Sequence, residues 1–261
     1  MTFSVDQFRL SGKTAIVTGA GGRGNSIGRA YAMGLAKAGA AVVVADLNGE
    51  GANRVSDEIQ SAGGKAIAVQ VDIADPASVA NMANAAARAF GGVDILVNNA
   101  ALMAELSHQT IIDVPIDYWN RTMAVNVTGA LNCAQAVVPL MRKRGGGKIV
   151  NQVSGGAYPA VSIYGISKLA LVGLTTTLAR QLGHEKINVN AIAPGNVTSE
   201  AGRALVPDDS PFIKFLEATV AMRPRGEPDE LVGTLLLLCS PAGDWVTGQV
   251  IHVDGGWILR P

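Results

Sequence analysis

The sequence predicts an α/β fold built on a doubly wound, mostly parallel sheet of seven strands. Short runs of β-branched residues alternate with longer, Ala-rich stretches of helical periodicity through the first two-thirds of the chain. The strand candidates are continuously apolar, as in Ala41-Val42-Val43-Val44-Ala45, which is typical of parallel strands covered on both faces. Regular alternation of strand and helix favours right-handed crossovers, with helices on both faces of the sheet.

Each element follows from its own stretch of the pattern. The predicted strands are the short apolar runs Thr14–Thr18, Ala41–Ala45, Ala66–Val71, Ile95–Asn98, Lys148–Val153, Asn188–Ala193 and Gln249–Val253. The predicted helices are the longer stretches Ser26–Ala38, Gly49–Ala62, Pro76–Phe90, Ile116–Arg144, Ile163–Gly183 and Glu230–Cys239.

The pattern changes after Pro194. Residues 195–228 contain several Pro, Gly and charged residues around one apolar stretch, Phe212–Val220. We interpret this segment as a partly helical flap over a substrate rather than as a linker. We therefore expect a single Rossmann-type domain over residues 1–261, and neither repeats nor low-complexity tracts suggest a second one.

Composition excludes several classes of function. The 261 residues include 21 basic and 21 acidic ones, so the formal net charge is zero, and no basic run suggests a nucleic acid partner. Cys133 and Cys239 are far apart and predict neither a disulfide framework nor a metal cluster. The first ten residues include Asp6 and Arg9 and lack a signal-peptide core. No apolar run approaches the ~20 residues of a bilayer span, so we expect a cytoplasmic protein without metal or membrane partners.

A glycine-rich segment, Thr18 to Gly28, joins the first strand to the first helix. Glycines allow a close backbone approach to a pyrophosphate, and the start of the helix offers unpaired N–H groups that Ser26 can partly cap. Asp46 closes the second strand, where a carboxylate can accept hydrogen bonds from ribose hydroxyls and repel a 2′-phosphate. NAD is therefore favoured, although Arg23 leaves NADP open and Asp46 has the alternative role of a helix cap.

Tyr164 and Lys168 lie four residues apart on a predicted helix, so they share one face. A phenol titrates near pH ~10. A neighbouring ammonium, with the positive ring of an oxidised nicotinamide, would stabilise the phenolate and lower its pKa. Ser154, at the end of the fifth strand, can hydrogen-bond the same substrate oxygen. The same spacing also occurs often by chance, and the alternative interpretation is that Tyr164 is a surface tyrosine and Lys168 a solvated lysine.

Taken in order, the motifs resemble the short-chain dehydrogenase/reductase family from about Gly12 to Trp257. The matching positions are Thr18-Gly19 with Ile27-Gly28, Asp72, Asn98-Asn99-Ala100, Asn126, Ser154, Tyr164 to Lys168, Pro194-Gly195 and Val253-Asp254-Gly255-Gly256. The resemblance implies an enzyme that uses NAD or NADP on a small-molecule alcohol or ketone. It also implies a homodimer or homotetramer formed through the two long helices, Ile116–Arg144 and Ile163–Gly183.

The resemblance also implies roles for individual residues. Asn126 would hold a water leading to Lys168, and the predicted catalytic set is Asn126, Ser154, Tyr164 and Lys168. Asp72 and Ile73 would flank the adenine, and Pro194, Gly195, Val197 and Thr198 would anchor the carboxamide side of the nicotinamide ring. The full predicted cofactor-binding set is Gly19, Arg23, Ser26, Ile27, Asp46, Asp72, Ile73, Asn98, Ala100, Tyr164, Lys168, Pro194, Gly195, Val197 and Thr198.

Two positions depart from the family pattern. Six residues, Ala20 to Asn25, separate Thr18-Gly19 from Ser26-Ile27-Gly28, where the family usually has three residues and a glycine at the position of Ser26. A similar long turn occurs in enoyl-acyl-carrier-protein reductases, which space their Tyr and Lys more widely. Ala101 stands where the family usually has glycine, and we expect catalysis to tolerate it.

These observations predict an oxidoreductase that moves a hydride between NAD(H) and a secondary alcohol or its ketone. The first alternative is a 3-oxoacyl-thioester reductase that uses NADPH and receives a carrier protein at basic residues near the flap, for which Arg203, Arg223 and Arg225 are available. The second is a non-catalytic, nucleotide-sensing protein. Leu102, Met103, Val197 and the stretch Phe212–Leu216 would supply apolar walls to the substrate pocket, although that stretch could also simply pack as a flap helix.

Overall fold

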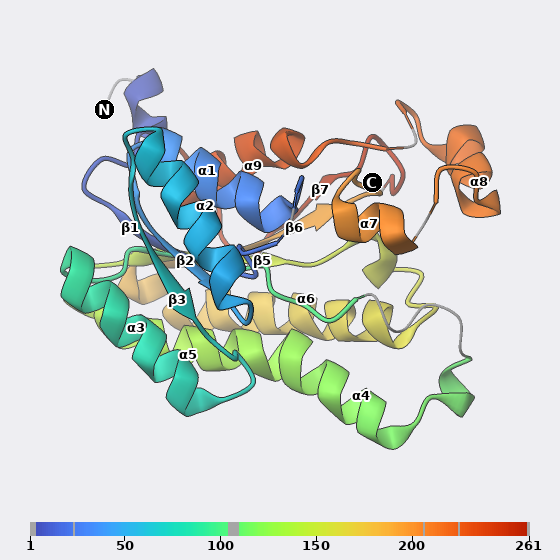
Figure 1. The fold of residues 1–261 in the computed structure, drawn as a ribbon, viewed down its shortest axis with the longest axis horizontal. Coiled ribbons are helices and arrows are strands. Elements are labelled where there is room, and N and C mark those ends of the chain that lie inside the picture. The colour runs from blue at the N-terminus through green and yellow to red at the C-terminus, as the bar shows by residue number, and fades with distance from the viewer. Residues whose placement is uncertain (1–3, 23, 104–109, 206, 224, 260–261) are drawn as a thin grey trace.

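The computed structural model describes residues 4–22, 24–103, 110–205, 207–223 and 225–259 (Figure 1). Every predicted strand is present there, with ends within one residue of the expected ones. The strands are β1 (Thr14–Thr18), β2 (Ala41–Asp46), β3 (Lys65–Gln70), β4 (Ile95–Asn98), β5 (Gly147–Gln152), β6 (Ile187–Pro194) and β7 (Val250–Val253). They form one sheet in the order β3-β2-β1-β4-β5-β6-β7, and every neighbouring pair is parallel. The predicted fold class is confirmed.

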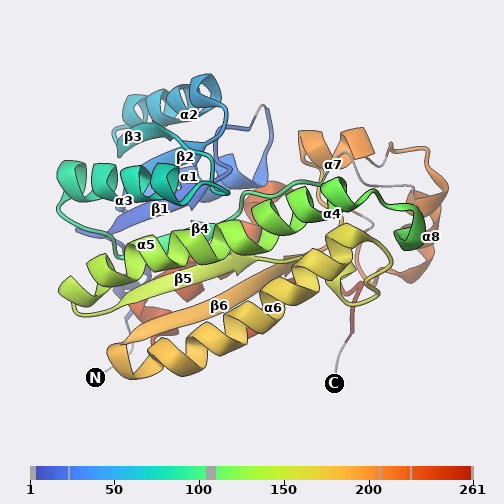
Figure 2. The ribbon, with the colours of Figure 1, turned by 90° about the horizontal axis from the view of Figure 1, so that it is seen from below.

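Helices cover both faces of this sheet (Figures 1 and 2). The helices are α1 (Ile27–Lys37), α2 (Gly49–Ser61), α3 (Pro76–Phe90), α4 (Ile116–Met123), α5 (Gly129–Lys143), α6 (Ile163–Leu182), α7 (Glu200–Leu205), α8 (Pro211–Thr219) and α9 (Val232–Cys239). One face packs against α1, α2 and α9, and the other against α3, α5 and α6. Val42 and Val44 enter the first core and Val43 enters the second. Both sides of β2 are therefore buried, which explains its continuous apolar run.

The predicted helix Ile116–Arg144 is present as a continuous helix over Ile116–Lys143, but it is not uniform, which the sequence did not indicate. A π-helical turn, Ala124–Thr128, separates α4 from α5. It turns Asn126, which is 2% exposed, toward the loop after β4 and toward α6. Neither glycine nor proline occurs between residues 124 and 128, so no residue of the kind that usually breaks a helix indicates the bulge.

The continuous helix Ile116–Lys143 is long and apolar enough, by length and composition alone, to cross a membrane. This differs from the expectation that the sequence contains no such run. The part formed by α5 packs against α3, β4 and β5, and its residues Cys133, Val137 and Met141 are fully buried in the core. The helix therefore has the packing of a core helix in a soluble protein.

The segment after β6 carries two short helices, α7 and α8, at the carboxyl end of the sheet (Figure 1). Its two ends are held together, because Val197 bridges to Gly226 and the N–H of Thr198 donates to the carbonyl of Gly226 at 2.8 Å. The predicted helix Glu230–Cys239 starts as a 3₁₀ turn, Pro228–Leu231, and continues as α9.

The opposite, amino end of the sheet is fixed by buried polar groups. Asp94 accepts the N–H of Thr14 at 2.9 Å and forms ion pairs with Lys13 at 3.4 Å and Arg144 at 3.1 Å. These contacts join the starts of β1 and β4 to the end of α5. Side-chain carboxylates thus satisfy backbone groups that the strand ends leave unpaired.

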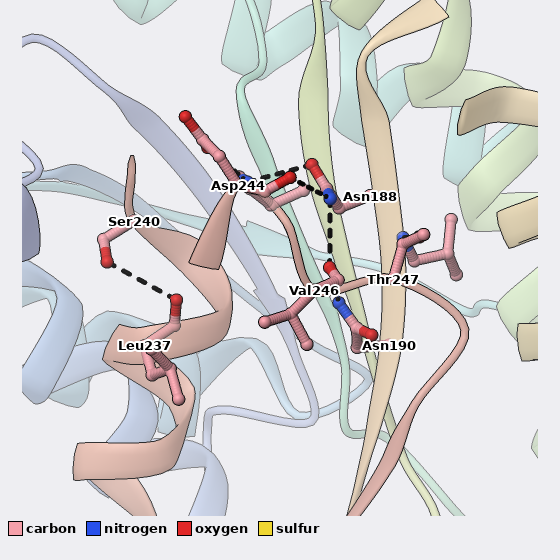
Figure 3. A network of polar contacts seen from close by, with 9 residues as sticks. Asn188, Asn190, Leu237, Ser240, Asp244, Val246 and Thr247 are labelled. Atoms are coloured by element: carbon pink, nitrogen blue, oxygen red, sulfur yellow. Dashed lines mark hydrogen bonds and ion pairs between the residues drawn. The ribbon is translucent and has the colours of Figure 1, made fainter. Parts of the chain in front are cut away.

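The same end of the sheet holds the connection between α9 and β7 (Figure 3). Asn188 donates to the carbonyls of Asp244 and Val246, each at 3.0 Å, and Asn190 donates to the carbonyl of Val246 at 2.8 Å. Lys148 lies in a cavity of about 610 Å³ beside this network and contacts both Asn188 and Asp244. The polar groups of this network satisfy one another's hydrogen bonds, so we assign the network a structural role.

Candidate active site

A cleft of about 690 Å³ opens at the carboxyl ends of the strands, where ligands bind in parallel α/β sheets. It runs from the glycine-rich turn after β1 and from Asp46 after β2 to Ser154 after β5 and to Tyr164 and Lys168 on α6. Its volume falls within the ~300–1,000 Å³ of small-molecule sites. Thirteen of the predicted site residues line it: Gly19, Ser26, Ile27, Asp46, Asp72, Ile73, Ala100, Ser154, Tyr164, Lys168, Pro194, Gly195 and Val197.

Two glycines of the glycine-rich turn are packed too closely to be replaced by any residue with a Cβ. Gly19 has a φ of +66°, and a Cβ there would lie 2.7 Å from the Cα of Ala100. A Cβ on Gly28 would lie 2.1 Å from the carbonyl oxygen of Gly19. Asn99 donates to the carbonyls of Thr18 at 3.0 Å and Gly19 at 2.9 Å, so it fixes the start of the turn. The sequence analysis named Asn99 as part of a motif but did not predict that it holds the turn in place.

Asp46 projects from the end of β2 into the cleft. Its Oδ2 accepts the N–H of Gly21 at 2.7 Å and its Oδ1 accepts the N–H of Asn48 at 2.9 Å. The cap of α2 is Asn48, whose side chain accepts the N–H of Gly51. The alternative interpretation of Asp46 as a helix cap was therefore wrong.

These residues fit a dinucleotide. Gly19 and Gly28 leave no room for a Cβ, α1 begins at the cleft with Ser26 accepting the N–H of Arg29 at 3.3 Å, and the carboxylate of Asp46 stands beside the turn. Bare backbone at a helix start suits a pyrophosphate, and a carboxylate at this place suits ribose hydroxyls. Among the residues described here, no cluster of His, Cys, Asp and Glu is suited to a metal ion.

Tyr164 and Lys168 are brought together at the other end of the cleft. The ammonium of Lys168 lies 5.5 Å from the ring centroid of Tyr164 and donates to the carbonyl of Gln152 at 2.7 Å. Lys168 is only 1% exposed. Burial lowers its pKa to about 7, because the charged form is the one that loses solvation.

Burial also raises the pKa of Tyr164 to about 12, and a hydrogen bond with Ser154 acts in the opposite direction. For the chain alone this is the reverse of the lowered pKa that the spacing suggested. The reason is that desolvation of the phenolate outweighs the favourable contacts that the chain supplies. The expectation of a lowered pKa for Tyr164 also counted the positive charge of an oxidised nicotinamide. For the complex of the chain with that cofactor, the lowered pKa stays a prediction.

Three predicted site residues lie behind the cleft rather than on its surface. Asn98 donates to Asn151 at 2.9 Å in the core. Asn126 donates to the carbonyl of Leu102 and to Ser167, each at 3.0 Å, and accepts the N–H of Leu102 at 2.7 Å. Asn126 therefore holds the loop after β4, and its predicted water link to Lys168 stays a prediction.

Thr198 is the third of these residues, and its hydroxyl donates to Glu227. Arg23, the fourth predicted position outside the lining, lies outside the described residues. The cleft also has lining residues that the sequence interpretation did not select as site residues. Among them are Arg121 on α4, Ser199 just before α7 and Gly202 within α7, which carry no local motif and enter the site through the packing of distant segments.

Comparisons with known proteins are consistent along the chain. Residues 22–258 match the family model described as "Enoyl-(Acyl carrier protein) reductase". An uncharacterized oxidoreductase of Mycobacterium tuberculosis is 46% identical over 248 residues, which cover 95% of this chain and 98% of that protein. The 7alpha-hydroxysteroid dehydrogenase of Escherichia coli is 38% identical over 259 residues, which cover 98% of both chains.

A solved structure shows the same fold. The structure of a 7 alpha-hydroxysteroid dehydrogenase complexed with NADH and 7-oxo glycochenodeoxycholic acid superimposes with a TM-score of 0.90 and 37% identity, over 99% of each chain. The likeness therefore covers the whole length of the sheet, the cleft and the segment after β6.

Proposed function

Because the chain belongs to the short-chain dehydrogenase/reductase family, we propose that it transfers a hydride between NAD(P) and a secondary alcohol or its ketone. One observation carries the proposal. A half-buried tyrosine and serine meet a buried lysine at one end of a cleft whose other end is a glycine-rich turn beside Asp46. The relatives are named oxidoreductases or dehydrogenases, which supports the same class of reaction.

In the proposed mechanism, the chain handles the proton and the position of the substrate. Ser154 orients the substrate oxygen, and Tyr164 takes the proton of that oxygen during oxidation or returns it during reduction. Lys168 stabilises the phenolate and holds the ribose next to the nicotinamide. A bound nicotinamide cofactor supplies the hydride acceptor or donor. At neutral pH the phenol of the chain alone is protonated, since its pKa is about 12.

NAD is the preferred cofactor in this proposal, and NADP is the alternative. Asp46 is held by two backbone N–H groups with its carboxylate on the cleft. A fixed negative charge there disfavours a 2′-phosphate. Solved relatives are complexed with NADH in one case and with NADP in another, so the preference rests on Asp46.

The lining of the cleft includes Leu102, Met103, Val125 and Val197, but the apolar wall expected from residues 212–216 does not line it. These side chains support a substrate with an apolar carbon skeleton around its reacting carbinol. The carrier-protein alternative gains no support from the basic residues that it needs. Arg223 pairs with Glu230, and both Arg203 and Arg225 pair with Asp208.

The remaining features of the proposal concern the whole chain. We take residues 1–261 as one domain in which 195–228 is the substrate flap. We expect a cytoplasmic homodimer or homotetramer that associates through the outer faces of α4, α5 and α6, which lie side by side (Figure 2).

The experiment that tests this function is Tyr164→Phe. NADH binding, measured by fluorescence titration, should survive, while turnover of a secondary alcohol panel that includes a hydroxysteroid should fall by roughly 10²–10⁴-fold. Tyr158→Phe is the matched control, because it removes a phenol oxygen from the loop between Ser154 and Tyr164. Turnover that persists in Tyr164→Phe would refute the mechanism, and binding without turnover in the wild type would favour the sensor.

A further inference from the structure

The glycine-rich turn is fastened to the segment after β6. The carbonyl of Asn25 accepts the N–H of Glu200 at 3.2 Å. Gly24 has a φ of +56°, and a Cβ there would lie 2.9 Å from the carboxylate of Glu200. The last residues of the turn therefore lie directly against the first turn of α7, which is remote in sequence but adjacent in space.

A single carboxylate joins this turn to the base of the flap. Glu227 Oε2 accepts the side-chain amide of Asn25 at 3.1 Å and also the hydroxyl of Thr198. Thr198 itself is held in place, because its N–H donates to the carbonyl of Gly226 at 2.8 Å. Glu227 thus links two segments that are remote in sequence, the end of the glycine-rich turn and the start of the segment after β6.

We propose that Glu227 is a positioning residue, which holds the pyrophosphate turn and the Thr198 segment at the separation that a dinucleotide requires. The inference rests on the proposed function, since the turn is assigned to the pyrophosphate and Thr198 to the nicotinamide. A dinucleotide binds both segments at once. A link that fixes their separation before binding removes part of the ordering cost, and it tightens binding without touching the ligand.

The link accounts for the unusual length of the turn. Six residues, Ala20 to Asn25, separate Thr18-Gly19 from Ser26, and it is the last of them that reaches both Glu200 and Glu227. Ser26 then caps α1 directly after the link. The extra residues therefore connect the start of α1 with the flap.

Binding of two ligands tests the proposal. In the proposed binding mode NADH contacts both segments, whereas ADP-ribose lacks the nicotinamide that would lie against the segment of Val197 and Thr198. Asn25→Ala and Glu227→Gln should each weaken NADH binding about fivefold, which corresponds to ~1 kcal/mol for one hydrogen bond. Both should leave ADP-ribose within about twofold of the wild type. The double variant should lose no more than either single variant, because both remove the same link.

Glu230→Gln is the matched control. It makes the same chemical change three residues away, in the same 3₁₀ turn, where the carboxylate contacts Arg223 and the N–H of Glu227 but not the glycine-rich turn. Equal losses for NADH and ADP-ribose, additive losses in the double variant, or NADH binding unchanged from the wild type would each overturn the positioning role. Wild-type protein that binds neither ligand would refute the proposed function instead.

Discussion

Replacing Lys168 by methionine separates the cost of a buried charge from the packing of the side chain. Lys168 is 1% exposed and donates to one carbonyl, that of Gln152, at 2.7 Å. Burial lowers its pKa from 10.5 to about 7. Methionine has a similar length, is flexible and fills the same apolar path without a charge. We expect Lys168→Met to unfold at a higher denaturant concentration than the wild type at pH 7.

The pH dependence of this difference follows from the direction of the shift. Between the folded pKa of about 7 and the unfolded value of 10.5, the unfolded chain holds one more proton at this site than the folded chain. The wild-type free energy of unfolding therefore rises by ~1.4 kcal/mol for each pH unit in that window, relative to a variant that cannot titrate there. As the pH falls to the folded pKa of about 7, the wild type loses this part of its free energy of unfolding. The free energy of unfolding of Lys168→Met therefore exceeds that of the wild type by most below neutral pH.

Urea denaturation of both proteins from about pH 6 to about pH 9 measures this difference directly. Lys65→Met is the control, since Lys65 is exposed on β3 and its replacement removes a charge without a change in burial. A stability difference between wild type and Lys168→Met that is constant across the pH range would refute the reasoning. It would mean that the amine reaches water in the folded protein.

Two further predictions concern the two ends of the sheet. Asp46→Ser should raise the affinity for NADPH relative to NADH by about tenfold, measured by fluorescence titration, because it removes the charge that repels a 2′-phosphate; an unchanged ratio would contradict the role given to Asp46. Asp94→Asn should lower the free energy of unfolding by ~2–3 kcal/mol, since Lys13 and Arg144 lose their shared, buried partner. NADH binding should not change, because the cleft lies at the other end of the strands. A loss of binding would contradict the assignment of binding to the carboxyl end of the sheet and of stability to its amino end.

The sequence was a reliable guide to the fold because the relevant physics is local. A parallel strand that is covered on both faces must be apolar throughout, and runs such as Val42-Val43-Val44 show this directly. Helix ends were predicted closely where a cap or a glycine marks them, as at Ser26 and Gly91. The π-helical turn at Ala124–Thr128 was missed because packing against the loop after β4, rather than any local residue, requires it.

The candidate site could be predicted only where its residues follow strands in a regular order. Ser154, Tyr164 and Asp46 were selected because each stands at or just after a strand end or at a helix start, and all three line the cleft. The link between Asn25 and Glu227 joins residues 202 positions apart. No periodicity or spacing connects them, because the contact depends on how the flap returns over the turn.

Tyr164, the proposed acid–base residue, shows most clearly what the spacing of residues in the sequence leaves out. A separation of four residues correctly placed the ammonium of Lys168 beside the ring of Tyr164, but it carried no information on burial. Burial makes the phenolate costly and also weakens the charge on the lysine, so the chain alone raises the pKa of Tyr164 to about 12. Proton transfer near neutrality therefore needs positive charge from a second source. On this argument the residues that hold the nicotinamide cofactor are as necessary to the acid–base chemistry as Ser154.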